Sequence, residues 1–422
     1  MNNDKNEKPC CSFCNSENID EVMDFGKVAL AGGFVKEEFF SEEKKFPLRL
    51  YFCKDCYAVQ VIDKIPGEDL FQNYFYFSSS IRSLCNHFND YAAEVTSRFL
   101  KPQSATVLEF GCNDGVLLRP LADQGIKTVI GVDPAANVVT SIDDPRITIV
   151  NDFFTEDVAK QILKKHGKVD LVMANNVYAH ISDIQGTTRA IKQVLDDDGV
   201  FVFEVHYLGK VINELQYDMI YHEHLYYYSL LSAIKHFERY NMVVFDIKPL
   251  LIHAGSMRFY VCKDSSKHCS VISPSVIRLI KEEKEKGFDK FETFKLFSDT
   301  VASHKTKLIN LLKLLKKEGS TIVGYGASGR ANTIIQYCGI NHDLLDYIID
   351  DAPAKTGYFT PGSHFKIHLS SILDSSDPPD YILIFAWSFI EEIKSRNTSY
   401  LTKGGQMILP LPEVTITPEK LS

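Results

Sequence analysis

The chain has 422 residues, enough for two or three domains. Hydrophobic residues make up 45% and charged residues 24%, as in ordinary globular proteins, and a net charge of -9 argues against a nucleic-acid backbone as the main partner. No apolar run reaches the ~18 residues of a membrane span, and the polar N-terminus lacks signal-peptide character, so we expect a cytoplasmic protein that binds neither nucleic acid nor membrane.

Two Cys-x-x-Cys pairs lie in the N-terminal part, the first formed by Cys11 and Cys14 and the second by Cys53 and Cys56. A cytoplasmic chain of this size favours thiols or a metal site over disulfides. Four thiolates at this spacing are typical of tetrahedral zinc, and Cys10 is a neighbouring alternative with poorer spacing. A redox pair would not need four cysteines. The pattern predicts a structural zinc ion.

An aromatic run at 74–77 comes next, followed by a helical pattern through Leu84, Phe88, Tyr91 and Val95. An aromatic cluster before a helix belongs more often to packing than to a site. Periodicity alone therefore assigns this run no function.

Residues 107–115 are predicted to form a buried strand and a tight turn that leads into a helix. Gly111 and Gly115 let the backbone of the turn approach a ligand closely. Glu109 lies just before the turn, and the following strand ends in Asp133, where an acid can accept both hydroxyls of a ribose. This order is typical of a mononucleotide-binding half.

The identity of the nucleoside depends on Asp114, which stands where a helix would start. A dinucleotide fold places a pyrophosphate at that helix N-terminus, and an anion there would repel it. An acidic turn suits a ligand that has no phosphate and carries a positive centre, as S-adenosylmethionine does. A turn that binds nothing is the alternative.

Further strands are expected at 147–150, 169–174 and 199–205, alternating with helices. This alternation predicts a parallel, doubly wound α/β sheet whose ligand lies beyond the carboxyl ends of the strands. Polar residues fall at those ends, and Asp152 with Phe153 could hold the adenine. The expected methyl-donor residues are Glu109, Gly111, Asn113, Gly115, Asp133, Asp152, Phe153 and Asn175.

Residues 216–228 are dense in side chains that donate or accept protons. His222 and His224 could form a metal pair, but no carboxylate lies at a clear ligand spacing, and a hydrogen-bonded, partly buried histidine is the simpler reading of either one.

The C-terminal third is predicted to begin with one helix over 281–317, followed by a second strand, glycine turn and helix at 321–332. Strands at 347–351 and 381–387 complete a smaller α/β unit. The second turn carries Arg330 and no acid, which suits a phosphate. A nucleotide fold without a ligand is the alternative.

Seven motifs, in this order, resemble those of the three-domain nucleotide-sugar C-methyltransferases, which methylate a carbon of a keto-sugar. The matching residues are the two Cys-x-x-Cys pairs, 74–79, 109–115, 176–180, 221–224, 324–327 and 350–357. The resemblance implies a small zinc-binding domain at 1–72, a Rossmann-like S-adenosylmethionine-dependent methyltransferase core at 73–250, and a second Rossmann-like domain at 251–422 that helps to hold a nucleotide-linked sugar. It also implies a monomer.

The resemblance further implies that five residues face the sugar, with His224 as the base. These residues are Tyr76, His180, Tyr221, Glu223 and His224. A carbon beside a keto group becomes nucleophilic once a base of near-neutral pKa removes its proton. We therefore expect His224 to form an enolate at carbon 3 of a 4-keto sugar, Glu223 to orient the loop, and the other three to donate to substrate oxygens.

Three other functions remain open from the sequence. The first is O-methylation of a sugar or small-molecule hydroxyl with the same donor. The second is a zinc-containing protein that binds the donor without catalysis, against which the 221–224 cluster speaks. The third is a nicotinamide-dependent oxidoreductase that uses the C-terminal turn, with Asp350 or Asp351 as the ribose acid.

Overall fold

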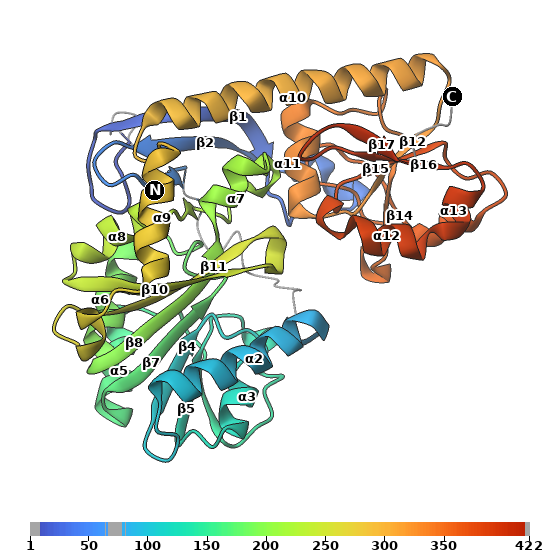
Figure 1. Ribbon diagram of the computed structural model, residues 1–422. Helices are drawn as coiled ribbons and strands as arrows, with labels where there is room; N and C mark the ends of the chain where they lie inside the picture. Colours follow the sequence, from blue (N-terminus) through green and yellow to red (C-terminus); the bar gives the residue numbers. More distant parts are fainter. Residues whose placement is uncertain (1–8, 64, 66–77, 81, 418–422) are drawn as a thin grey trace. The chain divides into compact units, whose positions relative to one another are not determined.

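The computed structural model describes residues 9–63, 65, 78–80 and 82–417 (Figure 1). The chain forms two compact units, each built from separated segments. Unit 1 consists of Met1–Asp20, Phe52–Leu208 and Leu225–Lys290, and unit 2 of Glu21–Tyr51, Gly209–His224 and Phe291–Ser422. Each unit therefore contains residues from all three of the domains that the resemblance implies, 1–72, 73–250 and 251–422.

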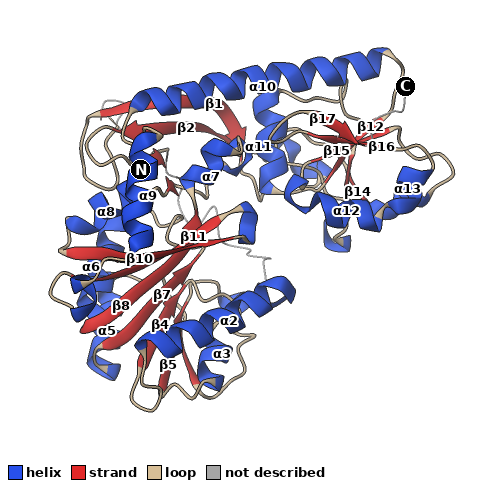
Figure 2. Ribbon diagram, viewed as in Figure 1, coloured by secondary structure: helices blue, strands red, loops and turns tan. Residues whose placement is uncertain are grey.

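Unit 1 contains a seven-stranded sheet in the order β10-β11-β8-β7-β4-β5-β6 (Figure 2). Its strands are β4 (Thr106–Phe110), β5 (Thr128–Val132), β6 (Ile147–Val150), β7 (Val169–Asn175), β8 (Leu195–His206), β10 (Met242–Leu250) and β11 (Ser256–Lys263). The strands from β6 to β8 pair in parallel, as the alternation of strands and helices predicts. The antiparallel pair β10–β11 extends the sheet beyond the predicted strands.

Helices cover both faces of this sheet. They are α2 (Arg82–Phe99), α3 (Leu118–Asp123), α4 (Ala136–Val139), α5 (Glu156–His166), α6 (Ile184–Val194), α8 (Leu230–Glu238) and α9 (Pro274–Glu285). Alternate residues of β4 separate the two faces, because side chains along a strand point to opposite sides. Val107 lies in one buried cluster with residues of α2 and α3, and Leu108 lies in another with residues of α5, α6 and α8. The core is thus two apolar layers around the sheet.

The carboxyl ends of β4, β7 and β8 bring polar side chains together. β4 lies between β5 and β7, so the order of the strands reverses at β4. Open α/β sheets bind ligands at such a reversal, beyond the carboxyl ends of the strands. Glu109 is in register with Met173, and Asn175 with Glu204. Because these residues point to one face, a polar row replaces the apolar layer at this edge.

The cysteine loops of unit 1 lie beside a short antiparallel pair formed by β3 (Val59–Val61) and β9 (Tyr226–Tyr227). Phe13, between the first two cysteine ligands, is buried with its ring centroid 5.0 Å from that of Tyr226 and 5.5 Å from that of Tyr228. Aromatic packing therefore anchors this loop.

Unit 2 contains a six-stranded sheet in the order β14-β13-β12-β15-β16-β17. Its strands are β12 (Ile322–Tyr325), β13 (Ile348–Asp350), β14 (Ile367–Leu369), β15 (Tyr381–Ile384), β16 (Gln406–Leu409) and β17 (Thr415–Thr417). All pairs are parallel except β16–β17. This is the second Rossmann-like sheet predicted from the sequence, although its fourth strand ends at Ile384 and Trp387 begins a short 3-10 helix.

Other elements of unit 2 come from all parts of the chain. They are β1 (Ile19–Ala29), β2 (Lys45–Cys53), α7 (Leu208–Asn213), α10 (Phe291–Lys317), α11 (Gly329–Cys338), α12 (Ile390–Arg396) and α13 (Thr398–Thr402), of which β1, β2 and α7 each extend by one or more residues into the unit 1 segments. No helix among the described residues is long and apolar enough to cross a membrane.

The single helix predicted over 281–317 is wrong. α9 ends at Glu285, and Gly287 adopts a φ of 72°, which favours glycine. The N–H of Gly287 donates to Lys284 O at 3.0 Å, and that of buried Phe288 donates to Glu283 O at 2.9 Å. These two bonds are a Schellman motif, which ends the helix.

Candidate functional site

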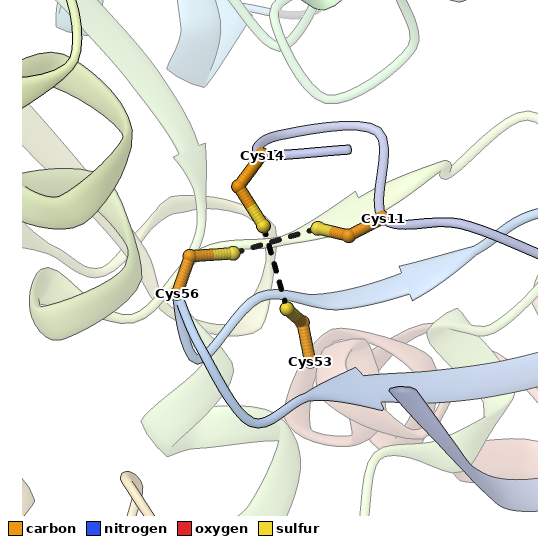
Figure 3. A group of neighbouring side chains, drawn as sticks. All are labelled: Cys11, Cys14, Cys53 and Cys56. Carbon is orange, nitrogen blue, oxygen red and sulfur yellow. Dashed lines mark hydrogen bonds between the residues drawn. The ribbon is translucent and has the colours of Figure 1, made fainter. Parts of the chain in front are cut away.

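The four predicted cysteine ligands converge in unit 1 (Figure 3). All four sulfur atoms lie within 4.8 Å of one another, with 3.4 Å between Cys11 Sγ and Cys56 Sγ and 3.6 Å between Cys14 Sγ and Cys53 Sγ. Zn–S bonds of about 2.3 Å in a tetrahedron would separate the sulfurs by about 3.8 Å, so the group fits zinc. Cys10 is exposed and stands outside the group.

Both cysteine pairs are shaped by the same turn. Asn15 follows the first pair with a φ of 61° and donates its N–H to Cys11 O at 2.8 Å. Tyr57 follows the second with a φ of 63° and donates to Cys53 O at 2.8 Å. The side-chain amide of Gln60 donates to Cys11 Sγ at 3.0 Å. With all four positions filled by protein sulfur, the zinc would be structural.

The turn after β4 has the backbone that its glycines predict. Gly111 has a φ of 66° and Gly115 a φ of 77°. A Cβ atom on Gly111 would lie 2.7 Å from Val177 Cβ, and one on Gly131 would lie 2.6 Å from Leu118 Cδ1. Glycine is therefore required at the turn both for its conformation and for close packing.

Glu109 and Asn175 form a hydrogen-bonded pair at the ends of β4 and β7. Asn175 Nδ2 donates to Glu109 Oε1 at 2.8 Å. Glu109 Oε2 and Asn175 Oδ1 are buried and have no partner among the described residues. Burial, together with the nearby carboxylates of Asp133 and Glu204, raises the pKa of Glu109 to about 8. A cation would satisfy this group, and the methionine ammonium of S-adenosylmethionine is one.

Asp133 directly follows β5, which ends at Val132, and is almost fully buried. Its Oδ2 accepts from the N–H of Asn113 at 2.9 Å, and its Oδ1 accepts from the N–H of Ala135 at 2.9 Å. Burial raises its pKa, which these two backbone donors lower. Each carboxylate oxygen has a second lone pair, so Asp133 can still accept ribose hydroxyls.

Asp114 has a structural partner that the sequence did not reveal. Its Oδ2 accepts from the N–H of Ser79 at 3.1 Å and from the Ser79 hydroxyl at 2.5 Å, while Asn113 Oδ1 accepts from the N–H of Ser78 at 3.0 Å. α3 begins at Leu118, so Asp114 lies in the turn before the helix and not at the first position of the helix. Asp114 holds the segment before α2 onto the turn.

The proposed adenine contacts, Asp152 and Phe153, follow β6. Asp152 Oδ1 accepts from the N–H of Phe153 at 2.7 Å, and the Phe153 side chain is 52% exposed. Next to them, Asn151 Nδ2 donates to Asp133 O at 2.8 Å, which ties this loop to the predicted ribose acid. An exposed aromatic ring beside that acid can stack on a base.

His180 follows β7 in unit 1, and its N–H donates to Val177 O at 2.8 Å. Burial lowers the pKa of its imidazole to about 4. The ring is therefore neutral near pH 7 and can donate a hydrogen bond without carrying charge. Tyr76 is also predicted to contact the sugar, and it lies outside the described residues.

Tyr221, Glu223 and His224 lie in unit 2, where the rings of Tyr221 and His224 are 4.0 Å apart between centroids and inclined by 36°. His224 Nδ1 lies 2.7 Å from Met219 O. A carbonyl oxygen can only accept, so Nδ1 carries a hydrogen, and Nε2 of the neutral ring carries the lone pair. Burial raises the pKa of Glu223 to about 7.

His222 is buried, and its Nε2 lies 3.0 Å from Pro47 O in the same unit. It thus belongs to the fold of unit 2, as the simpler reading of the sequence expected. The group of four cysteines is the metal-binding cluster among the described residues, and it includes neither His222 nor His224.

The second glycine turn, after β12 in unit 2, carries a compensated charge. Arg330 Nε donates to Asp218 Oδ2 at 2.8 Å, and Trp387 Nε1 donates to the same oxygen at 2.9 Å. Asp218 is fully buried. The sequence predicted a turn without an acid, because Asp218 is 112 residues away from Arg330 in the chain. The phosphate site at Arg330 stays a prediction, because Asp218 compensates the charge of Arg330 while Arg330 Nη2 is buried without a partner among the described residues.

One polar network in unit 1 was absent from the predicted site. Glu204, Arg258 and Glu94 form buried or half-buried ion pairs, with Glu204 Oε1 2.7 Å from Arg258 Nε and Glu94 Oε2 3.0 Å from Arg258 Nη1. His87 Nε2 lies 2.9 Å from Glu204 Oε2. The sequence offered one indication of this network, because Glu204 is the single acid in an otherwise apolar strand at 199–205.

Three family models match the chain. They are a domain described as zinc binding at residues 11–71, a methyltransferase domain at 85–246 and a C-methyltransferase C-terminal domain at 251–412. The C-methyltransferase NovU of Streptomyces niveus is 30% identical over 404 residues, covering 96% of this chain and 95% of NovU. The ubiquinone biosynthesis O-methyltransferase of Azorhizobium caulinodans is 27% identical over 108 residues, which are 25% of this chain and 42% of that protein.

Solved methyltransferases are similar to part of the chain. An S-adenosylmethionine-dependent methyltransferase from Clostridium acetobutylicum has a TM-score of 0.32 at 16% identity, covering 42% of this chain and 91% of its own. Magnesium protoporphyrin IX methyltransferase from Synechocystis, solved with bound S-adenosylhomocysteine, has a TM-score of 0.33 at 14% identity, covering 42% of this chain and 83% of its own.

The zinc-binding group, the turn at 111–115 that is predicted to bind the methyl donor (the donor turn) and the second Rossmann-like sheet match the three family models in chain order. The protein is therefore an S-adenosylmethionine-dependent methyltransferase with a zinc site, as the sequence predicted. Its similarity to NovU extends over nearly the whole of both chains. The chain belongs to the C-methyltransferase family that includes NovU.

Proposed function

We propose that the protein methylates carbon 3 of a nucleotide-linked 4-keto deoxysugar. Carbon is a poor nucleophile unless a neighbouring carbonyl acidifies its C–H bond, and a 4-keto group does so at carbon 3. The order of motifs along the chain supports this substrate class, and the similarity to a C-methyltransferase supports carbon rather than oxygen as the acceptor.

The observation that carries the proposal is the tautomer of His224. Its Nδ1–H donates to Met219 O at 2.7 Å, which places the lone pair of the neutral ring on Nε2. An imidazole has a pKa near the working pH, so it can remove a proton and later release it. We assign to Nε2 the removal of the carbon 3 proton, whose electron pair moves into the enolate.

Tyr221 and Glu223 would support this step. The Tyr221 ring packs 4.0 Å from the His224 ring and restricts its orientation. A Cβ placed on Gly32 would lie 3.4 Å from Glu223 Oε1, so the carboxyl group lies next to the backbone of Gly32. Its raised pKa, about 7, keeps part of it protonated near neutrality, where it can donate a hydrogen bond.

His180 and Tyr76 are assigned to donate hydrogen bonds to substrate oxygens, most effectively where the enolate charge develops. His180 suits this role because its pKa of about 4 keeps the ring neutral. S-adenosylmethionine, when bound, supplies an electrophilic methyl group on a sulfonium. Glu109, Asn175 and Asp133 would hold its amino-acid and ribose parts. The carbon 3 electron pair would form the new C–C bond while the S–CH3 bond breaks and its electron pair stays on sulfur, which leaves S-adenosylhomocysteine.

The proposal is tested by incubating the enzyme with ¹³C-methyl-labelled donor and a panel of nucleotide-linked 4-keto sugars. The expected product has one added methyl group by mass spectrometry, and its ¹³C shift is that of a methyl on carbon. A methyl on oxygen would overturn the choice of acceptor atom. Transfer to sugars without a keto group at an equal rate would overturn the substrate class.

A further inference from the structure

A polar row crosses one face of the unit 1 sheet at the carboxyl ends of its strands. Asn175 pairs in register with Glu204, and Glu204 pairs in register with Arg258 of β11. Asn175 bonds to Glu109 at the donor turn, so the row runs without interruption from that turn to β11. Tyr91 of α2 packs on the row, with the Arg258 guanidinium 3.4 Å from its ring centroid.

His87 of α2 is held on this row by a carboxylate that is itself fixed. Its Nε2 lies 2.9 Å from Glu204 Oε2 and 3.1 Å from Oε1. Glu204 is fully buried and also binds Arg258 through Nε and Nη2. A carboxylate accepts, so Nε2 carries a hydrogen. The other ring nitrogen, Nδ1, has no hydrogen-bond partner among the described residues, and the His87 side chain is 13% exposed.

The start of α2 lies against the donor turn. Ser78 and Ser79, just before the helix, donate to Asn113 and Asp114 of that turn. His87 lies in the second turn of α2, and its partner Glu204 lies two residues before the end of β8. His87 is therefore on the side of the sheet where the methyl donor binds.

The charges of the donor decide what His87 can do. The methionine end of S-adenosylmethionine carries an ammonium and a carboxylate. Glu109, with a buried and unpartnered Oε2, fits the ammonium. A cationic donor would bind the carboxylate most strongly. Arg258 is unavailable because Glu204 and Glu94 occupy its nitrogens and only 1% of it is exposed. Among the side chains of this row, His87 therefore remains as the donor to the carboxylate, through Nδ1.

We propose that His87 binds the methionine carboxylate of the methyl donor through Nδ1, with Glu204 and Arg258 as positioning residues. In the complex the imidazole lies between two carboxylates and holds a proton on each nitrogen. A purely structural role, in which His87 only docks α2 on the sheet, is the alternative that the test must separate. The proposal rests on the methyl donor alone and is independent of the sugar.

The test compares the affinities of S-adenosylmethionine and its decarboxylated analogue, which keeps the ammonium, by isothermal titration calorimetry. The wild-type protein should prefer the carboxylated donor. His87→Ala should lose about tenfold to a hundredfold in affinity for it, as expected for a hydrogen bond to a charged group, and keep its affinity for the analogue within about twofold. A docking role would weaken both ligands equally.

Arg98→Gln provides the matched control, because Arg98 lies on the same face of α2 and pairs with Asp246 of β10 at 2.7 Å. It should keep the wild-type preference. His87→Gln, which can still donate to Glu204, should lose the preference while keeping the melting temperature, so it serves if His87→Ala is poorly folded. A wild-type ratio of affinities in either His87 variant would overturn the proposal.

Discussion

Substitution of Gly111 by alanine tests whether the donor turn depends on close backbone packing. The new methyl would sit on a residue with a φ of 66° and lie 2.7 Å from Val177 Cβ and Cγ2. The left-handed conformation costs about 1–2 kcal/mol for an L-residue, and overpacking against a branched side chain adds about 1–3 kcal/mol. We expect Gly111→Ala to lower the free energy of unfolding by about 2–5 kcal/mol.

Gly125→Ala is the matched control, because Gly125 has a φ of 77° and nothing lies within 4 Å of its added Cβ. It should lose only the conformational part, about 1–2 kcal/mol. Urea unfolding without ligand measures both losses, and calorimetry measures the affinity for S-adenosylhomocysteine. We expect Gly111→Ala to bind at least tenfold more weakly and Gly125→Ala to bind normally. Equal losses of stability and equal affinities in the two variants would refute the reasoning.

Three further outcomes are expected. Purified protein should contain one zinc per chain by elemental analysis, Cys53→Ser should lose the zinc and melt earlier, and Cys10→Ser should do neither. Burial raises the pKa of Glu109 in the folded protein to about 8. Without ligand, the contribution of protonated Glu109 to stability is therefore complete below about pH 4.5 and is lost as the pH rises to 8. The free energy of unfolding should fall over this pH range in the wild-type protein, and it should fall less in Glu109→Gln. Asp218→Asn removes the fully buried anion that pairs with half-buried Arg330 and should cost about 3–5 kcal/mol in denaturant unfolding, whereas Glu391→Gln, in a surface pair with Lys394, should stay within about 0.5 kcal/mol.

The parts of the site that the sequence predicted are those whose chemistry is local. The cysteine pairs each close a turn within a few residues, so their spacing alone indicates zinc ligands. The donor turn needs Gly111 and Gly115 at positions that a strand and a turn define. In both cases the backbone conformation follows from neighbouring residues.

The parts that the sequence did not predict depend on pairing between distant segments. Asp218 compensates Arg330 across 112 residues, and Arg258 reaches Glu204 across 54. The pattern of apolar and polar residues around these side chains does not indicate such a distant partner. The break at Gly287 was visible as a glycine, but a glycine within a helical pattern is also tolerated, and burial of Phe288 decided the outcome. The composite units follow from the same non-local contacts.

The central claim, that His224 makes an enolate at carbon 3, is tested most directly by hydrogen exchange. A nucleotide-linked 4-keto deoxysugar is incubated in D₂O with enzyme and S-adenosylhomocysteine, and deuterium at carbon 3 is followed by NMR. Wild-type protein should incorporate deuterium at carbon 3 without methyl transfer, and His224→Ala should reduce the rate at least a hundredfold while keeping its affinity for the nucleotide sugar. Exchange at the wild-type rate in His224→Ala would contradict the account.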